Sequence, residues 1–272
     1  MKLNNCILCQ SSSKSVVAKQ TFKDEYLTLI NPRLNELDRS WVKCNDCGLI
    51  YHDPQLEAVE TDVLYSKFRD TSFRGEVADE YFDRIVSLPK EESENYIKSS
   101  WLRNQIPDHL DKGGSILDIG SGGGVFLYTF LQQNKFWEAH GVEPTVEFAE
   151  LTQRKLNCSV CAGNYKKSLF NTKFDLITCN QVLEHVTNPV DFLRDIFDDL
   201  NHGGYLYIEV PDAVDFQELS PEHDRFLAQH LWYFSSKVLT KIFQDIGFSV
   251  VKIERQKTIR GRNNLVSLLL KD

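Results

Sequence analysis

Four cysteines are the residues of this sequence whose spacing most clearly indicates chemistry. They form two Cys-x-x-Cys pairs, Cys6 with Cys9 and Cys44 with Cys47. A two-residue spacer lets both thiolates of a pair turn toward one ion, and two pairs complete a tetrahedral zinc site. A set of unligated buried thiols is the alternative. Because four thiolates leave no open coordination position, we expect a structural zinc ion that takes no part in catalysis.

The other three cysteines are expected to act as small apolar residues. Cys158 and Cys161 share the two-residue spacer, but they fall at a predicted strand, where alternation points them unfavourably for one ion. Cys179 falls in another predicted strand. The total of seven cysteines is odd and the first residues do not resemble a signal peptide, which argues against a disulfide framework.

A glycine-rich loop is the second chemical signal. It runs Asp118-Ile119-Gly120-Ser121-Gly122-Gly123-Gly124 and leads from a predicted strand into a predicted helix. Such glycines allow a tight turn and close approach of the backbone to a ligand. The Gly-x-Gly-x-Gly spacing differs from the pyrophosphate fingerprint, and the Lys-Ser/Thr of a P-loop is absent. Glu143 ends the next predicted strand, where an acidic side chain can accept both hydroxyls of a ribose; a surface carboxylate is the alternative.

Two histidines are candidates for a general base. His185 follows one predicted strand and His230 lies in the long loop after the next, and ligands of such sheets bind at the carboxyl ends of strands. A histidine near its ordinary pKa can take a proton at neutral pH. For His230 the alternative is an exposed loop residue. For His185 the alternative is an anchor for its loop, with Glu184 orienting a base or capping a helix.

These residues need a framework, and the hydrophobic pattern predicts one of alternating strands and helices from residue 115 onward. The predicted strands are 116–119, 139–143, 159–162, 175–180 and 205–210, and the predicted helices are 125–133, 146–156, 191–200 and 235–246. Residues 248–254 and 265–270 are expected to form a closing antiparallel pair. Strand–helix alternation implies an α/β fold with a parallel sheet covered on both faces.

We expect three parts along the chain. Residues 1–60 would form a zinc-binding leader, largely irregular, with two short strands around the second cysteine pair. Residues 61–112 would form a helical lid or linker divided at Pro89 and Pro107, and residues 113–272 the catalytic domain. Aromatic candidates for the lid are Tyr65, Phe73, Tyr81 and Phe82.

Composition narrows the function classes. The 272 residues are 42% hydrophobic and 26% charged, as in ordinary globular proteins, and 31 basic against 39 acidic residues give a net charge of −8. An acidic chain is poorly suited to neutralising many phosphates, so a nucleic-acid partner is disfavoured. The only basic cluster is Arg255, Lys257, Arg260 and Arg262. No apolar run reaches the roughly 18 residues of a membrane span, so we expect no membrane span and a cytoplasmic protein.

Residues 115–270 resemble class I S-adenosylmethionine-dependent methyltransferases. The matching segments are 117–124, 141–144, 174–186, 200–206 and 247–248. The resemblance implies a Rossmann-like seven-stranded sheet and S-adenosylmethionine as cofactor. It implies a cofactor site made of Asp118, Gly120, Gly122, Gly124, Glu143, Asn164, Tyr165 and Asn180. In that site the residues of the glycine loop would line the methionine part, Glu143 would bind the ribose, Asn164 or Tyr165 would flank the adenine, and Asn180 would lie beside the methionine amine.

The leader sharpens the resemblance. The first cysteine pair followed by residues 44–54 is similar to the zinc-binding leader of many bacterial sugar and glycan methyltransferases. Among these are the C-methyltransferases of nucleotide-linked deoxysugars, which carry a Glu-His pair before Tyr-Phe-Ser. This chain has Gln229-His230 before 233–235, keeping the histidine but not the glutamate. Those enzymes also continue for another domain, so we favour oxygen over carbon as the methylated atom.

We therefore expect a methyltransferase that acts on a hydroxyl of a sugar, nucleotide-linked sugar or surface-glycan precursor. His230, with His185, would be the base, and the leader and lid would form the acceptor side. The alternatives are a sugar C-methyltransferase, a ribosomal RNA base methyltransferase and a non-catalytic module that binds a partner through its leader. The acidic charge argues against the second, and the intact glycine loop with Glu143 argues against the third.

Overall fold

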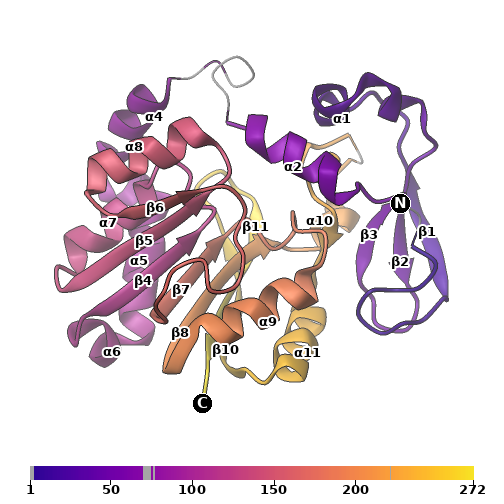
Figure 1. Cartoon of the computed structure of the whole chain (residues 1–272). Coiled ribbons are helices and arrows are strands. Elements are labelled where there is room, and N and C mark those ends of the chain that lie inside the picture. The colour runs from indigo at the N-terminus through magenta and orange to yellow at the C-terminus, as the bar shows by residue number, and fades with distance from the viewer. Residues whose placement is uncertain (1–2, 70–74, 76, 221) are drawn as a thin grey trace.

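Two sheets organise the chain in the computed structural model, which describes residues 3–69, 75, 77–220 and 222–272 (Figure 1). The larger sheet has seven strands in the order β10-β11-β8-β7-β4-β5-β6. Its strands are β4 (Gly114–Ile119), β5 (Trp137–Glu143), β6 (Ser159–Ala162), β7 (Phe174–Asn180), β8 (Leu200–Pro211), β10 (Ser249–Lys257) and β11 (Asn263–Leu270). The predicted seven-stranded Rossmann-like α/β sheet is confirmed.

The direction of the strands locates the ligand crevice. Strands β4 to β8 run parallel, and β11 pairs antiparallel with both β8 and β10. The central strand β4 has β5 on one side and β7 on the other, so the strand order reverses there. Ligands of open α/β sheets bind outside the carboxyl ends of the strands at such a reversal. Strand β4, which ends at Ile119, therefore ends beside the expected crevice.

Helices cover both faces of this sheet. They are α7 (Val125–Gln133), α8 (Val146–Leu156), α9 (Pro189–Asp199) and α11 (Ser236–Ile246). Each begins or ends where its sequence provides a boundary. Ser235 accepts a hydrogen bond from the backbone of Val238, and Gly247 ends α11 in the left-handed conformation, which glycine adopts without strain. Asn188 caps α9, and the proline at its first position, Pro189, has no backbone N–H to leave unpaired.

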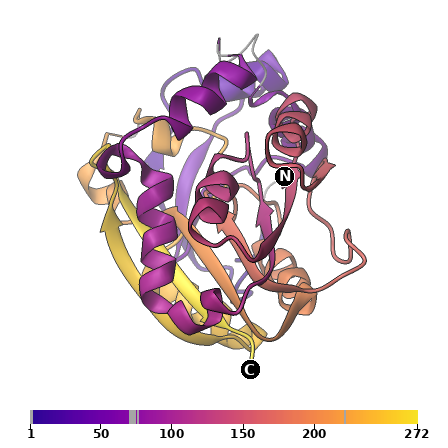
Figure 2. The ribbon, with the colours of Figure 1, turned by 90° about the vertical axis from the view of Figure 1, so that its left-hand side faces the viewer.

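The segment before the sheet is helical, as expected. It contains α2 (Ala58–Lys67), α4 (Ala78–Val86), a 3-10 turn η2 (Lys90–Glu92), α5 (Glu94–Gln105) and α6 (Pro107–Asp111). In Figure 2, α5 lies across the sheet close to β10 and β11. The indole Nε1 of Trp101 donates to Glu254 Oε1 at 2.7 Å, which ties α5 to β10. Leu102 and Ile106 are buried in the same hydrophobic cluster as Ile116 of β4, so α5 is part of the main core.

The smaller sheet is formed by the leader and by one distant strand. Its order is β1-β2-β3-β9, with β1 (Lys14–Lys19), β2 (Ser40–Cys44), β3 (Ile50–Asp53) and β9 (Trp232–Tyr233). The two strands expected around the second cysteine pair are present. The leader also contains β1, α1 (Glu25–Ile30) and a 3-10 turn η1 (Pro32–Glu36), so it is more regular than the sequence indicated. Strand β9 belongs to the loop after β8, which also holds the short helix α10 (Asp215–Glu218) and the 3-10 turn η3 (Asp224–Phe226).

Strand β9 joins the two parts of the molecule. It pairs antiparallel with β3, placing Ile50 opposite Tyr233 and Tyr51 opposite Trp232. The indole of Trp41 donates to the hydroxyl of Tyr233 at 3.3 Å inside a buried aromatic cluster. The leader therefore shares a sheet with a loop of the catalytic domain. In the described part of the chain, no helix is both long enough and apolar enough to cross a bilayer.

Candidate active site

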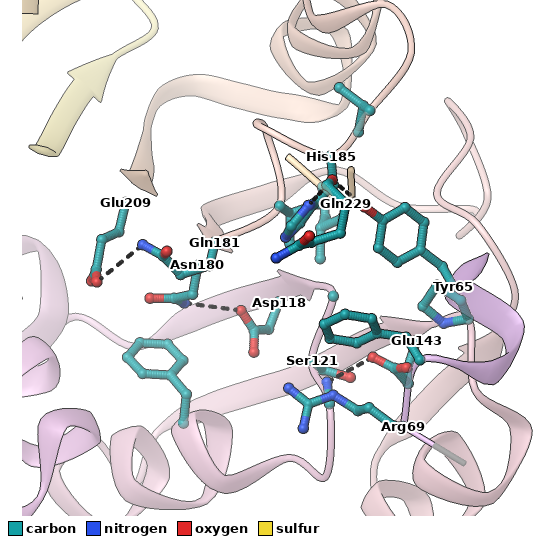
Figure 3. A pocket seen from close by; sticks show the side chains of 18 of the residues that line it. Tyr65, Arg69, Asp118, Ser121, Glu143, Asn180, Gln181, His185, Glu209 and Gln229 are labelled. Atoms are coloured by element: carbon teal, nitrogen blue, oxygen red, sulfur yellow. Dashed lines mark hydrogen bonds between the residues drawn. The ribbon is translucent and has the colours of Figure 1, made fainter. Parts of the chain in front are cut away.

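A cavity of about 810 Å³ lies at the carboxyl ends of the parallel strands (Figure 3). The glycine loop and the end of β5 line one side of it. The loops after β7 and β8 line the other side, and the β10–β11 turn reaches its edge. Helix α2 closes the cavity from the leader side, and α4 closes it from the side of α7 and α8. Tyr65 and Tyr81 line the cavity, whereas Phe82 is buried away from it against Phe148 and Val125. Phe73 lies outside the described residues.

The glycine loop is tied to Glu143. The backbone N–H of Gly122 donates to Glu143 Oε2 at 2.9 Å, and that of Thr145 donates to Oε1 at 3.0 Å. Gly120 and Gly122 have φ of 70° and 53°, a region that favours glycine. A Cβ on Gly120 would lie 2.5 Å from Cγ2 of Val182. The loop and the carboxylate thus form one preorganised unit in which Glu143 is only 4% exposed.

Asp118 is a buried carboxyl group in the middle of the cavity wall. It is 2% exposed, and it accepts from Thr178 Oγ1 at 2.6 Å and from Asn180 Nδ2 at 3.4 Å. Burial raises the pKa of Asp118 to about 7, although both hydrogen bonds oppose the shift. Figure 3 shows Asp118 and Asn180 turned toward one another. The carboxyl group of Asp118 can therefore change its charge near neutral pH.

Of the three remaining predicted cofactor residues, Asn164 and Tyr165 line the cavity. Nδ2 of Asn164 donates to Asp62, and the hydroxyl of Tyr165 donates to Asp199, each at 2.7 Å. Burial raises the pKa of Tyr165, and the hydrogen bond to Asp199 and the charge of Asp199 raise it further. Gly124 does not line the cavity. It precedes α7 with φ of 74°, and a Cβ there would lie 2.6 Å from Thr152, so its role is to let the helix begin.

The two predicted histidines lie together on the wall opposite Glu143. Their ring centroids are 4.9 Å apart. Nδ1 of His185 is 2.6 Å from the carbonyl oxygen of Gln229, and Nδ1 of His230 is 2.7 Å from that of Arg225. A hydrogen bond from Nδ1–H to a carbonyl leaves Nε2 as the acceptor in the neutral ring. Burial lowers the pKa of His185 to about 4 and holds that of His230 well below its usual value, so both rings are neutral at pH 7.

Glu184 is buried beside these imidazoles. It is 0% exposed, and neither carboxylate oxygen has a hydrogen-bond partner. Its Oε1 lies 3.9 Å from Nε2 of His185, and burial raises the pKa of Glu184 to about 8. Its backbone carbonyl accepts from the N–H of Leu231 at 2.8 Å. Glu184 therefore anchors the His230 loop through its backbone, while its carboxyl group has no hydrogen-bond partner among the residues that the structure describes.

The leader and α2 hold the loop that carries His230. Gln55 Nε2 donates to the carbonyl of Leu231 at 3.0 Å, and the hydroxyl of Tyr65 donates to that of Gln229 at 2.6 Å. The backbone N–H of Ala228 donates to Asp24 at 2.6 Å. These bonds join segments far apart in the sequence. The wall of the cavity that carries the two histidines is thus built by the leader together with the loop after β8.

Glu209 is a site residue that sequence reasoning missed. It lies in the buried second half of β8, is 3% exposed and lines the cavity. It accepts from Lys98 of α5 at 3.0 Å and from Tyr207 at 3.0 Å, and the amide of Asn264 also donates to it. The only sequence signal was a glutamate near the end of an apolar strand. Its partners come from two other elements, so local patterns could not assemble the network.

The four leader cysteines form one cluster. Sγ of Cys6 is 3.6 Å from that of Cys47, and Sγ of Cys9 is 3.5 Å from that of Cys44. Tetrahedral zinc with Zn–S bonds of about 2.3 Å separates its sulfurs by about 3.8 Å, so the arrangement fits zinc. Gly48 and Gln10 each follow a cysteine pair with positive φ, 84° and 59°, as two equivalent turns around one ion would require. The other three cysteines are not part of this cluster.

A family model described as "Methyltransferase domain" matches residues 93–253. A tRNA U34 carboxymethyltransferase of Proteus mirabilis is 28% identical over 171 residues, which are 57% of this chain and 52% of that protein. A mitochondrial ubiquinone biosynthesis O-methyltransferase of Schizosaccharomyces pombe is 32% identical over 102 residues, 35% of this chain and 37% of that protein. The chain thus spans about half the length, or less, of these curated relatives.

The fold recurs in solved methyltransferases. The crystal structure of magnesium protoporphyrin IX methyltransferase from Synechocystis, with bound S-adenosylhomocysteine, superposes with a TM-score of 0.55 at 15% identity. The match covers 78% of this chain and 99% of that one. The prediction of an S-adenosylmethionine-dependent methyltransferase is confirmed at the level of family and fold. The chain belongs to the methyltransferase domain family.

Proposed function

We propose that this protein is an S-adenosylmethionine-dependent methyltransferase that methylates a hydroxyl of a sugar, a nucleotide-linked sugar or a surface-glycan precursor. The proposal rests on the two sets of residues that line one cavity. Its one side is the glycine loop with Glu143, and its other side is the imidazole pair of His185 and His230. A cofactor-binding floor facing proton acceptors is what methyl transfer to a hydroxyl requires.

The cofactor side fits S-adenosylmethionine, which supplies the methyl group on its sulfonium when bound. In our proposal Glu143 accepts hydrogen bonds from the ribose hydroxyls and keeps those from Gly122 and Thr145, since each carboxylate oxygen can accept more than one. Asp118 and Asn180 receive the methionine amine. Asn164 or Tyr165 flanks the adenine, and the absence of a Cβ at Gly120 and Gly122 lets the methionine part approach the backbone.

The orientation of the two imidazoles supports their role in taking the proton of the acceptor hydroxyl. Both imidazoles donate from Nδ1 to a backbone carbonyl, which fixes the ring orientation and leaves Nε2 free. We assign His230 as the group that receives the hydroxyl proton while the acceptor oxygen attacks the methyl carbon, and His185 as its neighbour. The backbone bonds from Gln55 and Tyr65 hold this loop in place.

The cysteine cluster is proposed as a structural zinc site. Four thiolates close the coordination sphere, so the ion would stabilise the leader sheet and leave the chemistry to the cavity. Free thiolates of this kind persist in a reducing compartment, which agrees with the cytoplasmic location expected from the sequence.

Three observations support a small hydroxyl acceptor. The Schizosaccharomyces pombe relative is named as an O-methyltransferase, the leader resembles that of sugar and glycan methyltransferases, and the chain carries a net charge of −8. A small acceptor enclosed in a cavity needs no extended basic surface. The β10–β11 turn places Arg260 and Arg262 at the cavity, the latter beside Asp224, and an anionic group of a nucleotide-linked sugar could bind there.

A tRNA base is the second candidate acceptor. It is favoured by the similarity to the tRNA U34 carboxymethyltransferase of Proteus mirabilis, which extends over 57% of this chain. The acidic net charge opposes it, because tRNA binding relies on neutralising phosphates.

The deciding experiment measures cofactor binding and then methyl transfer. Calorimetric titration with S-adenosylhomocysteine, on protein of known zinc content, should give one site with micromolar affinity. Methyl-labelled cofactor would then be offered with a panel of nucleotide-linked sugars and, separately, with bulk unmodified tRNA. Label in the sugar fraction supports the first candidate, and label in tRNA supports the second. No cofactor binding by folded, zinc-loaded protein would overturn the proposal and favour a non-catalytic module.

A further inference from the structure

We propose that Glu184, His185 and His230 form a second metal site, for a divalent transition ion such as Zn²⁺, Mn²⁺ or Fe²⁺. Each of the three residues offers a ligand atom, and these atoms all lie within 4.8 Å of one another. The ligand set of two imidazoles and one carboxylate is the one used by many catalytic zinc and non-haem iron sites. The site differs from the cysteine cluster in position and in ligand type.

The orientation of both imidazoles supports the assignment. Nδ1 of His185 is bonded to the carbonyl of Gln229 at 2.6 Å and Nδ1 of His230 to that of Arg225 at 2.7 Å. Histidines that bind metals almost always donate their other ring N–H to a carbonyl or carboxylate, which fixes the ring and presents the remaining nitrogen. Here both rings are held in this way. Nε2 of His185 lies 3.9 Å from the carboxylate of Glu184.

The unpaired carboxylate is the second, independent observation. Glu184 is fully buried, and within the described part of the chain neither of its carboxyl oxygens has a hydrogen-bond partner. Buried carboxylates are normally hydrogen-bonded, paired with a cation or bound to a metal. The nearby guanidinium of Arg225 is paired with Asp215 at 3.0 Å, and Lys98 with Glu209 at 3.0 Å. A divalent ion would satisfy the carboxylate and would need the three ligand atoms to draw together by about 1 Å each.

The position of the ion would give it a function, and this part of the inference rests on the proposed methyltransferase activity. His185 and His230 line the cavity, so coordination positions not used by the protein would face the acceptor. A hydroxyl bound there would lose its proton to water more readily, because the cation stabilises the alkoxide. Its oxygen then forms the bond to the methyl carbon while the bond from carbon to sulfur breaks. The hydroxyl proton passes to water, and His230 acts as a ligand of the ion instead of receiving that proton.

Manganese binding tests the site without relying on turnover. Zinc-loaded protein with about one zinc per chain would be titrated with Mn²⁺, and free Mn²⁺ would be followed by electron paramagnetic resonance. We expect one Mn²⁺ per wild-type chain. Glu184→Gln and His185→Ala should weaken binding at least tenfold, while His223→Ala should bind as wild type does. His223 is the matched control, because it lies 2.8 Å from a carboxylate, Asp224, but has no second imidazole.

Folding of each variant would be checked by circular dichroism and by its affinity for S-adenosylhomocysteine. Glu184→Gln keeps the size of the side chain, so it carries the test if His185→Ala does not fold. Absence of Mn²⁺, Zn²⁺ and Fe²⁺ binding beyond the cysteine site would overturn the inference, as would unchanged affinity in Glu184→Gln. That outcome would leave cofactor binding intact, so the proposed function with His230 as base would stand. Loss of turnover on chelation, restored by Mn²⁺ with zinc content constant, would support the catalytic role of the ion.

Discussion

The two walls of the cavity are built in opposite ways. On the cofactor side, Asp118, the glycine loop and Glu143 come from 26 consecutive residues, and the hydrogen bonds that Glu143 accepts come from backbone groups at most 21 residues away. On the acceptor side, His230 is placed by a sheet and by hydrogen bonds to residues far away in the sequence; Gln55, for example, bonds to a residue 176 positions later.

This difference has a functional consequence. The cofactor side, which comes from one short stretch of sequence, keeps its geometry as long as the seven-stranded sheet is folded. An acceptor wall held by the leader depends on the leader, and through it on the cysteine cluster. We therefore expect perturbations of the leader to affect methyl transfer without affecting cofactor binding, and we order the predictions below by expected size.

Loss of the cysteine site should have the largest effect. In Cys44→Ala the protein should lose its tightly bound zinc, and amide exchange in residues 14–53 should rise because β1, β2 and β3 lose their anchor. Turnover should fall by more than about 100-fold, as expected when catalytic groups are misplaced. Affinity for S-adenosylhomocysteine should change by less than about threefold. Cys161→Ala, outside the cluster, is the control. Full turnover in zinc-free protein would refute the dependence of the acceptor wall on the leader.

Removal of the His230 imidazole should come next. His230→Ala should lower kcat by about 10²–10⁴-fold, the usual contribution of a positioned proton acceptor or of a ligand to a catalytic ion. Because His230 makes no hydrogen bond to the glycine loop, cofactor affinity should be unchanged. Single-turnover kinetics with labelled cofactor would separate the two quantities. If kcat stays within twofold of wild type, His230 has no catalytic role.

The converse experiment targets the floor. Glu143→Ala leaves the buried N–H groups of Gly122 and Thr145 without their acceptor, a cost of about 1–3 kcal/mol for each group that stays unpaired. The variant also lacks the proposed acceptor of the ribose hydroxyls, so affinity for S-adenosylhomocysteine should fall by about 10- to 100-fold, while zinc content stays at one per chain. Glu147→Ala, on the exposed first turn of α8, is the control. Unchanged affinity in the folded variant would remove Glu143 from the cofactor site.

The smallest effect should be a pH dependence of cofactor binding. The pKa of Asp118 is raised to about 7 by burial, so its carboxylate is mostly ionised at pH 8 and mostly protonated at pH 6. Only the ionised form attracts the methionine ammonium, so affinity should fall between pH 8 and pH 6 by at most about tenfold, the limit for one titrating group. In Asp118→Asn the profile should be flat over this range. A wild-type profile that is equally flat would exclude Asp118 as the group that titrates.

The sequence predicted the cofactor side of the cavity better than the side that carries His185 and His230, for a physical reason. The strands and helices after residue 113 follow from local hydrophobic periods, and the structure reproduces them with small shifts at most of their ends. The exception is β8, which begins at Leu200, five residues before the predicted strand 205–210. The cysteine cluster was equally easy to predict from the sequence, because each Cys-x-x-Cys pair is a local motif. Strand β9 has two residues and exists only because β3 pairs with it, so no local pattern could reveal it. For the same reason the bond between Lys98 and Glu209 and the contact of the two histidine rings could not be foreseen.

The pairing of β3 with β9 also sets an order of assembly. During synthesis the leader leaves the ribosome before β9, because the strand that completes its sheet follows only after about 180 further residues. Domains generally fold in the order in which they are made, and contacts distant in sequence form late. The newly made leader must therefore wait with one sheet edge exposed, and such an edge invites pairing with other chains. Early zinc capture by the two cysteine pairs would keep the leader compact during this interval, which gives the metal a task in biogenesis before the catalytic domain exists.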